Sequence, residues 1–390
     1  MSERFVSPRV KDIPPSGIRR FFDIAGTMRD VISLGVGEPD FVTPYHIRSA
    51  GIDSLISGET QYTANQGLLP LRREIAGYLK NRFSLEYSPE KEILVTVGAS
   101  EAIDLAFRAV LDRGDGVLLP DPGYVSYSPC VILADGVPQM VPTDEAGGFK
   151  LTRKALENAS DRSTKALMLP YPNNPTGTVL DEKTLEDIAA FCVERDLLVV
   201  TDEIYAELSY EGRVRSIASC PGMKERTIYI SGFSKAFAMT GWRLGYACAP
   251  AEILSQMNKI HQYTIMCASR QSQVAGMEAL RQGKTDQYAD IEKMKESYNR
   301  RRRLMVSALR DMGLDCIEPK GTFYCFPGIA STGLDSETFC TRLLQEKGVV
   351  CVPGNAFGKC GEGHIRCCYA TDIQKMSEAF RRMKDFIGSL

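Results

Sequence analysis

The chain alternates short apolar runs with longer amphipathic segments, and this alternation restricts its fold more than any other feature. The apolar runs occupy residues 93–97, 117–119, 166–169, 197–201 and 227–230, and amphipathic stretches follow at 100–111 and 181–195. Short apolar runs followed by helical segments are typical of parallel strands that are buried on both faces. The sequence therefore predicts an α/β fold, with three α/β/α layers around a mainly parallel sheet.

The pattern changes near Arg281. A long charged helix is expected over 287–312, followed by short apolar runs at 322–326, 349–352 and 364–368, with helices near 337–345 and at the C-terminus. This predicts a smaller α+β domain, and 390 residues suit two domains. We expect an N-terminal segment (1–44) that packs on the small domain or on a partner subunit, a large domain (45–280) and a small domain (281–390).

Composition removes several classes of function. The 47 basic and 49 acidic residues give a net charge of −2, which provides no general attraction to nucleic acid or to a membrane surface. No window approaches the roughly 20 apolar residues of a membrane span. The 12 cysteines are scattered without a CxxC pair, which favours reduced thiols in a cytoplasmic protein. His46, His261 and His364 are far apart, so we expect no metal site.

The run from Arg300 to Arg303 is the one candidate nucleic-acid patch. It lies on the expected long helix beside Glu292 and Glu296. Alternating charges of this kind favour a solvated, salt-bridged helix face instead.

Polar side chains follow three successive strands. Asn174 lies after the run 166–169, Asp202 directly follows 197–201, and Lys235 follows 227–230, eight residues before Arg243. In an open parallel sheet, ligands bind at the carboxyl ends of the strands. An amine that forms an imine, a carboxylate for a pyridinium nitrogen and a guanidinium for a phosphate are the groups that hold pyridoxal phosphate.

Each of these residues alone has a structural interpretation. The segment around Asn174 could be a simple Pro-Gly turn, and Asp202 could cap a helix. Lys235 could be a surface lysine. Their order along the chain favours the cofactor site.

With these motifs, the sequence resembles the class I aminotransferases, which are fold-type I enzymes that use pyridoxal phosphate. The stretch from Ser234-Lys235 to Arg243-Leu244-Gly245 is similar to the lysine-attachment signature of that family. Asn174-Pro175-Thr176-Gly177 and Asp202-Glu203-Ile204-Tyr205 are similar to its two upstream motifs. The resemblance extends from Ser33 to Arg366 and is greatest to prokaryotic aspartate and aromatic aminotransferases, with some likeness to acetyl-diaminopimelate aminotransferases.

The resemblance implies a role for each residue that would touch the cofactor ring. Lys235 would bind the aldehyde and then, as general base and acid, move a proton between the substrate Cα and the cofactor. Asp202 would keep the pyridine nitrogen protonated. Asn174 and Tyr205 would hydrogen-bond the phenolic oxygen, and Tyr124 would stack on the ring unless it is an ordinary packing residue.

The resemblance also places the phosphate at the start of the helix after Gly98. The backbone N–H groups of Ala99, Ser100 and Glu101 would bind it, with the Glu101 side chain pointing away, and Arg243 would add a guanidinium. Many relatives have a hydroxyl three residues before the lysine, where this chain has Gly232, so Ser231 or Ser234 would have to replace it.

Two further residues are implied at the substrate and at the subunit boundary. Arg366, with the backbone N–H of Gly37, would bind the substrate α-carboxylate, although an arginine in an apolar run can also be a snorkelling strand residue. Tyr62 would reach the phosphate in the neighbouring subunit, which predicts a homodimer with shared active sites.

The resulting hypothesis is a ping-pong transfer of the amino group of an L-amino acid, aspartate or an aromatic one or both, to a 2-oxo acid, with 2-oxoglutarate as the expected acceptor. A pyridoxal-phosphate-dependent C–S β-lyase would use the same lysine and carboxylate. A ligand-sensing regulator would need a DNA-binding domain, for which the segment before Gly35 is too short. Candidates for reading the substrate side chain are Arg19, Arg20, Phe21 and Arg270.

Overall fold

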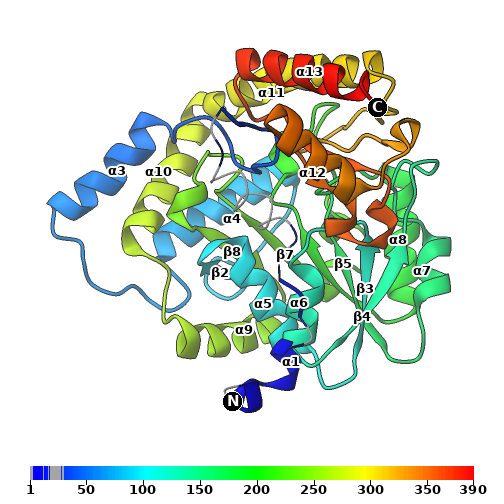
Figure 1. Ribbon diagram of the computed structural model, residues 1–390. Coiled ribbons are helices and arrows are strands. Elements are labelled where there is room, and N and C mark those ends of the chain that lie inside the picture. Colours follow the sequence, from blue (N-terminus) through cyan, green and yellow to red (C-terminus); the bar gives the residue numbers. More distant parts are fainter. Residues whose placement is uncertain (1–2, 12, 16, 18–27, 29) are drawn as a thin grey trace.

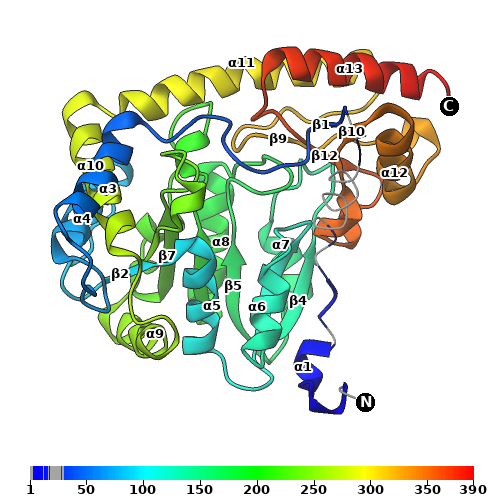
Figure 2. The ribbon, with the colours of Figure 1, turned by 60° about the vertical axis from the view of Figure 1, so that its left-hand side comes forward.

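A seven-stranded sheet forms the centre of the molecule, with helices on both faces (Figures 1 and 2). The computed structural model describes residues 3–11, 13–15, 17, 28 and 30–390. The strands lie in the order β2-β8-β7-β6-β5-β3-β4, and all are parallel except β8, which is antiparallel to both neighbours. Their bounds are β2 Ile93–Thr96, β3 Gly116–Asp121, β4 Val137–Pro142, β5 Thr164–Leu169, β6 Leu198–Asp202, β7 Thr227–Gly232 and β8 Gly245–Cys248. The predicted α/β class is confirmed.

Consecutive residues of the buried strands pack on opposite faces of the sheet. Leu167 joins the core beneath one layer of helices, whereas Ala166 and Met168 join the core beneath the other. This alternation explains why whole strands are apolar, because both faces are covered. One layer contains α5 (Gly98–Val110), α6 (Tyr127–Leu133) and α9 (Ala251–Thr264), and the other contains α4 (Leu69–Phe83), α7 (Arg153–Ala159), α8 (Glu182–Glu194) and α10 (Arg270–Asp286).

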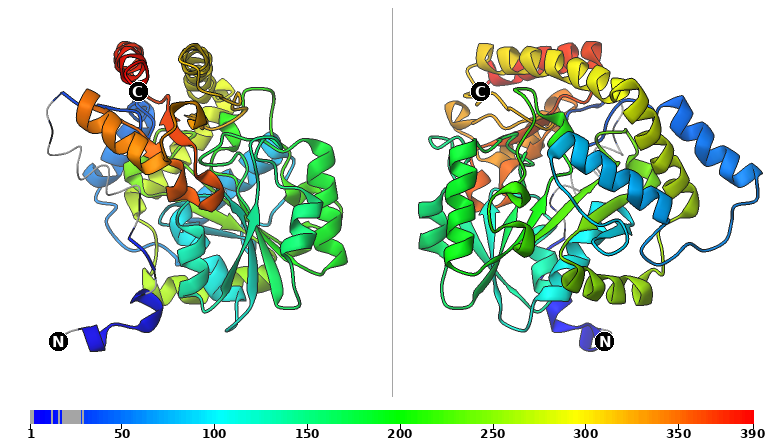
Figure 3. Two further views of the ribbon diagram at one scale, coloured as in Figure 1. Left: turned by 45° about the vertical axis from the view of Figure 1, so that its right-hand side comes forward. Right: turned by 180° about the vertical axis from the view of Figure 1, so that it is seen from behind.

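The C-terminal third forms two small sheets. Strands β9 (Tyr324–Cys325), β11 (Val352–Pro353) and β12 (Ile365–Cys368) pair antiparallel in the order β11-β12-β9, and β10 (Val349–Val350) pairs with β1 (Ile32–Ser33) in parallel. Helices α11 (Ala289–Asp311), α12 (Ser336–Lys347) and α13 (Ile373–Ile387) cover them. Figure 3 shows α11 and α13 side by side above the central sheet.

The N-terminal part contacts two regions. Its strand β1 pairs with β10, whereas α1 (Pro8–Lys11) contacts α6, and Arg9 of α1 forms an ion pair at 2.9 Å with Asp135, two residues after α6. Helix α3 (Tyr45–Ile56) packs against α10. The division into an N-terminal segment, a large domain and a small domain stays a prediction.

The basic run on α11 differs from the expected solvated face. Arg301 pairs with Asp40 at 2.7 Å and Arg302 pairs with Glu318 at 3.0 Å, and both side chains are largely buried. The helical repeat turns these two positions inward and leaves Arg300, beside Glu296, outside. Two of the four arginines therefore link α11 to neighbouring segments through ion pairs.

The part of the chain that the structure describes contains no helix with the length and apolar composition to cross a membrane. In the same described residues, no three His, Cys, Asp or Glu side chains are grouped so that they could share a metal ion.

Candidate active site

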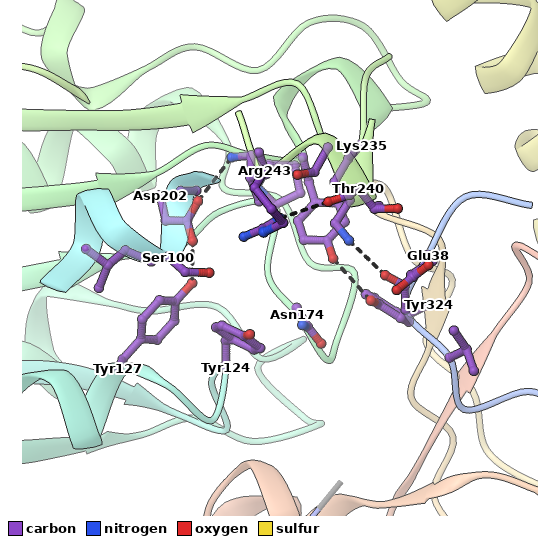
Figure 4. A pocket seen from close by; sticks show the side chains of 18 of the residues that line it. Glu38, Ser100, Tyr124, Tyr127, Asn174, Asp202, Lys235, Thr240, Arg243 and Tyr324 are labelled. Atoms are coloured by element: carbon purple, nitrogen blue, oxygen red, sulfur yellow. Dashed lines mark hydrogen bonds between the residues drawn. The ribbon is translucent and has the colours of Figure 1, made fainter. Parts of the chain in front are cut away.

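A cavity of about 600 Å³ lies where β5, β6 and β7 end, and β9 and β12 close its other side. Figure 4 shows Asn174, Asp202, Lys235, Arg243 and Tyr324 converging on it. The predicted residues that line it are Gly37, Ala99, Ser100, Tyr124, Asn174, Asp202, Tyr205, Ser234, Lys235, Arg243 and Arg366. Motifs that are distant in the sequence are thus brought together at the carboxyl edge of the sheet.

Lys235 lies three residues beyond β7, and its side chain crosses the cavity toward the N-terminal segment. Its Nζ donates a hydrogen bond to the carbonyl oxygen of Gly37 at 2.7 Å. Burial lowers the pKa of this amine to about 8, although the charge of Glu38 acts in the opposite direction. With that pKa, about a tenth of the amine is neutral at pH 7, far more than for an exposed lysine. Lys235 is therefore suited to act as a nucleophile or a base.

Asp202 is the last residue of β6 and is only 6% exposed. Its carboxylate accepts hydrogen bonds from the hydroxyl of Tyr127 at 2.9 Å and from the backbone N–H of Ile204 at 3.1 Å. Burial raises the pKa of the carboxyl, although these hydrogen bonds and the charge of Lys235 act in the opposite direction. The helix-cap interpretation of Asp202 is wrong, because the next helical turn, Ala206–Leu208, begins after Tyr205.

Arg366 brings a buried positive charge to the cavity from β12. Its Nη1 donates to Asn174 Oδ1 at 2.9 Å, and its Nη2 donates to the carbonyl oxygen of Gly35 at 2.8 Å. The guanidinium lies between the rings of Tyr324 and Phe357, with its Cζ 4.2 and 4.8 Å from their centroids. Among the described residues no carboxylate pairs with it, and its Nε has no partner. A buried charge without a counter-ion favours an anionic ligand.

The N-terminus of α5 and Arg243 form a second anion site. The first N–H groups of a helix have no intrahelical partner, so Ala99 and Ser100 present free donors at the positive end of the helix dipole. Gly98 begins α5 with φ +76°, and a Cβ there would overlap Nη2 of Arg243. The Arg243 guanidinium is held by a bond to the carbonyl oxygen of Thr240 at 3.0 Å. This arrangement suits a phosphate.

The glycine at 245 allows α5 to sit directly on the backbone of β8. Gly232 and Gly245 are partners in the ladder of β7 and β8. A Cβ on Gly245 would lie 2.5 Å from the carbonyl carbon of Gly98, and a Cβ on Gly232 would lie 3.0 Å from the Cα of Gly245. The first turn of α5 therefore rests on main-chain atoms.

This close packing also bears on the missing hydroxyl at Gly232. Ser231 faces away, and its hydroxyl donates to the carbonyl oxygen of Glu203 at 3.3 Å. Ser234 lines the cavity. Of the two serines, only Ser234 is placed to contact a ligand there.

Two predicted residues do not line the cavity of this chain. The Glu101 side chain points away, accepting from the backbone N–H of Val97 at 2.5 Å and lying 2.8 Å from Nδ1 of His261. Tyr62 is 79% exposed.

Of the candidates for reading the substrate side chain, the structure describes Arg270 alone, and Arg270 does not line the cavity. Arg270 is bound to the carboxylate of Glu59 at 2.8 Å. Arg19, Arg20 and Phe21 lie outside the described residues.

Sequence reasoning missed two tyrosines of the site. The hydroxyl of Tyr324 lies 3.1 Å from that of Tyr205, and Tyr127 binds Asp202. The one available signal was the spacing of Tyr127, which follows Tyr124 by three residues at the start of α6. Tyr324 lies in an expected strand that carries no motif.

Comparison with known proteins identifies the class. The sequence profile of the family described as aminotransferase class I and II matches residues 29–383. The chain belongs to this family, whose members generally use pyridoxal phosphate. It is an aminotransferase, and its substrates are an amino acid and a 2-oxo acid.

Individual relatives match over nearly their whole length. A putative aminotransferase of Bacillus subtilis, YugH, is 53% identical over 98% of both chains. The aspartate aminotransferase of Pyrococcus abyssi is 47% identical over 97% of both. The crystal structure of an aromatic aminotransferase from Pyrococcus horikoshii superposes with a TM-score of 0.90 at 45% identity, covering 95% of this chain and 99% of that one.

Proposed function

We propose that this aminotransferase moves the amino group of an L-amino acid, aspartate or an aromatic one or both, to a 2-oxo acid, with 2-oxoglutarate as the acceptor, in two half-reactions. The observation that carries the proposal is the common cavity. It joins an amine of lowered pKa (Lys235), a buried carboxylate (Asp202) and a guanidinium (Arg366) that pairs with no carboxylate of the described residues. Amino-group transfer needs a nucleophile, an electron acceptor and a carboxylate anchor together.

Pyridoxal phosphate fits the donor set of this cavity. Arg243 and the first turn of α5 would hold its phosphate, where the glycine at 98 leaves room beside the guanidinium. Asp202 would meet the ring nitrogen, Tyr124 would cover a ring face, and Ser234 would replace the hydroxyl that is absent at Gly232. When bound, this cofactor supplies an aldehyde that condenses with amines and a ring that withdraws electrons from the substrate Cα.

The side chains of this chain divide the proton chemistry between them. Lys235 would attach the aldehyde in the resting enzyme and, once released by the substrate amine, carry a proton from and to the substrate Cα. Asp202, buried and hydrogen-bonded, would hold a proton on the ring nitrogen. Asn174 and Tyr205 would donate to the phenolic oxygen.

Arg366 would bind the substrate α-carboxylate through its two outer nitrogens. These nitrogens now meet only neutral acceptors, and a carboxylate gives charge-assisted bonds that are roughly twice as strong. Gly37 lines the same cavity, and its backbone N–H would be a further donor.

The side chain of the amino-acid substrate would meet a different partner for each class of substrate. The cations that line the cavity within the described residues are Lys235, Arg243 and Arg366, each already assigned to another group. An aspartate side chain would therefore need a cation from a second subunit or from the N-terminal segment. An aromatic side chain would find Tyr124 and Tyr324 within the cavity. Relatives named for both aspartate and aromatic substrates support retaining both donors.

A homodimer would complete the site. Ile52, Leu55 and Ile56 expose apolar surface along α3, and Tyr62, six residues after the end of α3, is also exposed. Pairing two copies through this surface would cover it and carry Tyr62 toward the partner's phosphate site. Light scattering of the purified protein should give twice the mass of one chain, and Tyr62→Phe should weaken cofactor binding without separating the subunits.

The proposal is tested by Lys235→Ala, with Lys320→Ala as the matched control. Lys320 is exposed and pairs with Glu211. Each protein is saturated with pyridoxal phosphate and assayed with 2-oxoglutarate and a donor panel of aspartate, glutamate, phenylalanine, tyrosine, alanine and acetyl-diaminopimelate. Lys235→Ala should lose both transamination and the absorbance of the attached cofactor, whereas Lys320→Ala should keep both. Retention of both by Lys235→Ala would refute the assignment.

β-Elimination is distinguished by a separate assay. A β-lyase releases pyruvate from cystathionine without any oxo acid. We expect no such release at a rate comparable to transamination.

A further inference from the structure

Two buried thiols face each other at the back of the small antiparallel sheet. The pairing of β11 with β12 matches Val352 with Arg366, and continuing this register by one residue matches Cys351 with Cys367. Their Sγ atoms are 3.5 Å apart, and both residues are completely buried. All 12 cysteines of the chain are free.

The strand geometry suits a covalent bond between these two residues. The backbone N–H of Gly354 donates to the carbonyl oxygen of His364 at 2.8 Å, which is one of the two bonds that define a hydrogen-bonded pair at these opposed positions. Such pairs alternate with non-hydrogen-bonded pairs, so three residues further on, Cys351 and Cys367 form a non-hydrogen-bonded pair. The Cα atoms of such a pair are about 4.5 Å apart, within the range of about 4.4–6.8 Å that disulfides span.

The thiol pair is separated from the proposed substrate site by the thickness of one strand. Arg366 and Cys367 are consecutive in β12, so their side chains leave opposite faces of the sheet. Arg366 lines the cavity, whereas Cys367 packs in the apolar core with Phe339 and Leu343.

We propose that Cys351 and Cys367 form a redox modification site, at which a peroxide converts the two thiols into a cross-strand disulfide. One thiolate attacks the peroxide, an S–O bond forms as the O–O bond breaks, and, for hydrogen peroxide, the departing oxygen leaves as water after protonation. The second sulfur then attacks the first, the S–S bond forms, and the S–O oxygen leaves as a second water. Two electrons from the sulfur pair thus reduce one hydrogen peroxide to two waters.

The environment determines which oxidant fits and how fast it reacts. The core around the pair is closed, so a small peroxide enters more readily than a bulky disulfide reagent. The contact with Cys351, together with burial, raises the pKa of the Cys367 thiol. Thiolate is the reactive form, so oxidation is slow at neutral pH and is faster when the small sheet opens locally.

Oxidation should alter substrate binding, a consequence that rests on the proposed role of Arg366. Closing the sulfurs from 3.5 Å to the bond length of about 2.05 Å requires β11 and β12 to readjust. A misplacement of about 1 Å near a catalytic arrangement can reduce activity by up to about 100-fold. We expect a loss of kcat/KM within that range, recovered on reduction.

The bond itself is tested without reference to activity. Native protein saturated with pyridoxal phosphate is treated with hydrogen peroxide, alkylated and digested with trypsin without reduction. Cleavage after lysine and arginine places Cys351 in peptide 348–359 and Cys367 in peptide 367–375, which also holds Cys368. A linked 348–359/367–375 peptide, 2 Da lighter than the sum of its parts and still present in Cys368→Ser, is expected.

The alternative outcomes overturn the proposal. The link should be absent from Cys351→Ser, Cys351→Ala and Cys367→Ser. At least one of these variants must show the same absorbance of the bound cofactor as the parent protein. A link from 367–375 to peptide 321–342, which contains Cys325, would contradict the assignment, as would an unlinked Cys351 in oxidised parent protein. A further outcome is that the link forms while the oxidised parent protein shows no dithiothreitol-reversible loss of activity that is absent from Cys351→Ser. In that case the coupling to Arg366 is wrong, and the modification site stands.

Discussion

Replacing Arg366 by methionine tests the proposed carboxylate site most directly. The substitution keeps an unbranched side chain between Tyr324 and Phe357 and removes the two donors that now bond to Asn174 and Gly35. A hydrogen bond to a charged group contributes about 1.5–3 kcal/mol, so two such bonds to a substrate carboxylate contribute about 3–6 kcal/mol. At about 1.36 kcal/mol for each factor of ten, kcat/KM should fall by about 10² to 10⁴.

Arg366→Lys separates charge from geometry. Lysine retains a positive charge but lacks the planar fork that can contact both carboxylate oxygens. The kcat/KM of Arg366→Lys should lie between those of the parent and of Arg366→Met, near the middle of that range on a logarithmic scale.

The assay compares steady-state kcat/KM for the best donor in the parent, both Arg366 variants and a control, Arg342→Met. Arg342 lies on α12, is partly exposed and pairs with Glu346, so its loss should leave kcat/KM within about threefold of the parent. Thermal unfolding checks that each variant is folded. A folded Arg366→Met protein with kcat/KM within threefold of the parent would show that another group binds the carboxylate.

Three further predictions concern the cofactor site and Lys235. Gly98→Ala should weaken binding of pyridoxal phosphate at least tenfold, because its Cβ would displace the Arg243 guanidinium. Gly333 has a similar positive φ but open space around it, so titrating Gly98→Ala and Gly333→Ala with the cofactor separates backbone strain from displacement of Arg243. Equal losses of affinity in the two variants would contradict the argument. Attachment of the cofactor to apoprotein should speed up about tenfold per pH unit below pH 8 and level off above it, because only the neutral amine of Lys235 reacts. Between pH 8 and the ordinary lysine pKa of 10.5, the folded apoprotein binds fewer protons than the unfolded chain, so Lys235 should make the apoprotein more stable as pH rises through that window. Chemical denaturation at several pH values would measure the free energy of unfolding. A decrease of this free energy over the window would contradict the lowered pKa.

The buried parallel strands could be predicted from the sequence because each is an unbroken apolar run. Two strands lack that signal. Strand β4 (Val137–Pro142) lies at the edge of the sheet and contains two prolines, and β8 (Gly245–Cys248) is short and begins at Gly245, the last residue of the lysine-attachment motif. The long helix was expected from 287, but Gln287 and Tyr288 have positive φ and separate α10 from α11.

The site could be predicted only where a motif marks it. Lys235 and Asp202 follow strand ends, and the fold brings strand ends together. Tyr127 and Tyr324 reach the cavity from α6 and β9 through packing that no local pattern records. Tyr62 is exposed in the single chain, and its proposed contact with a phosphate would need a second chain.

The glycine contact beneath α5 determines where this enzyme can be re-engineered. Because Gly245 brings the main chain of β8 against that of α5, a side chain introduced there would push the helix off its support. Mutant libraries that seek new amino donors should keep this glycine unchanged. Variation belongs elsewhere in the lining of the cavity, where Val36 and Tyr324 present side chains that can be exchanged for larger or smaller ones.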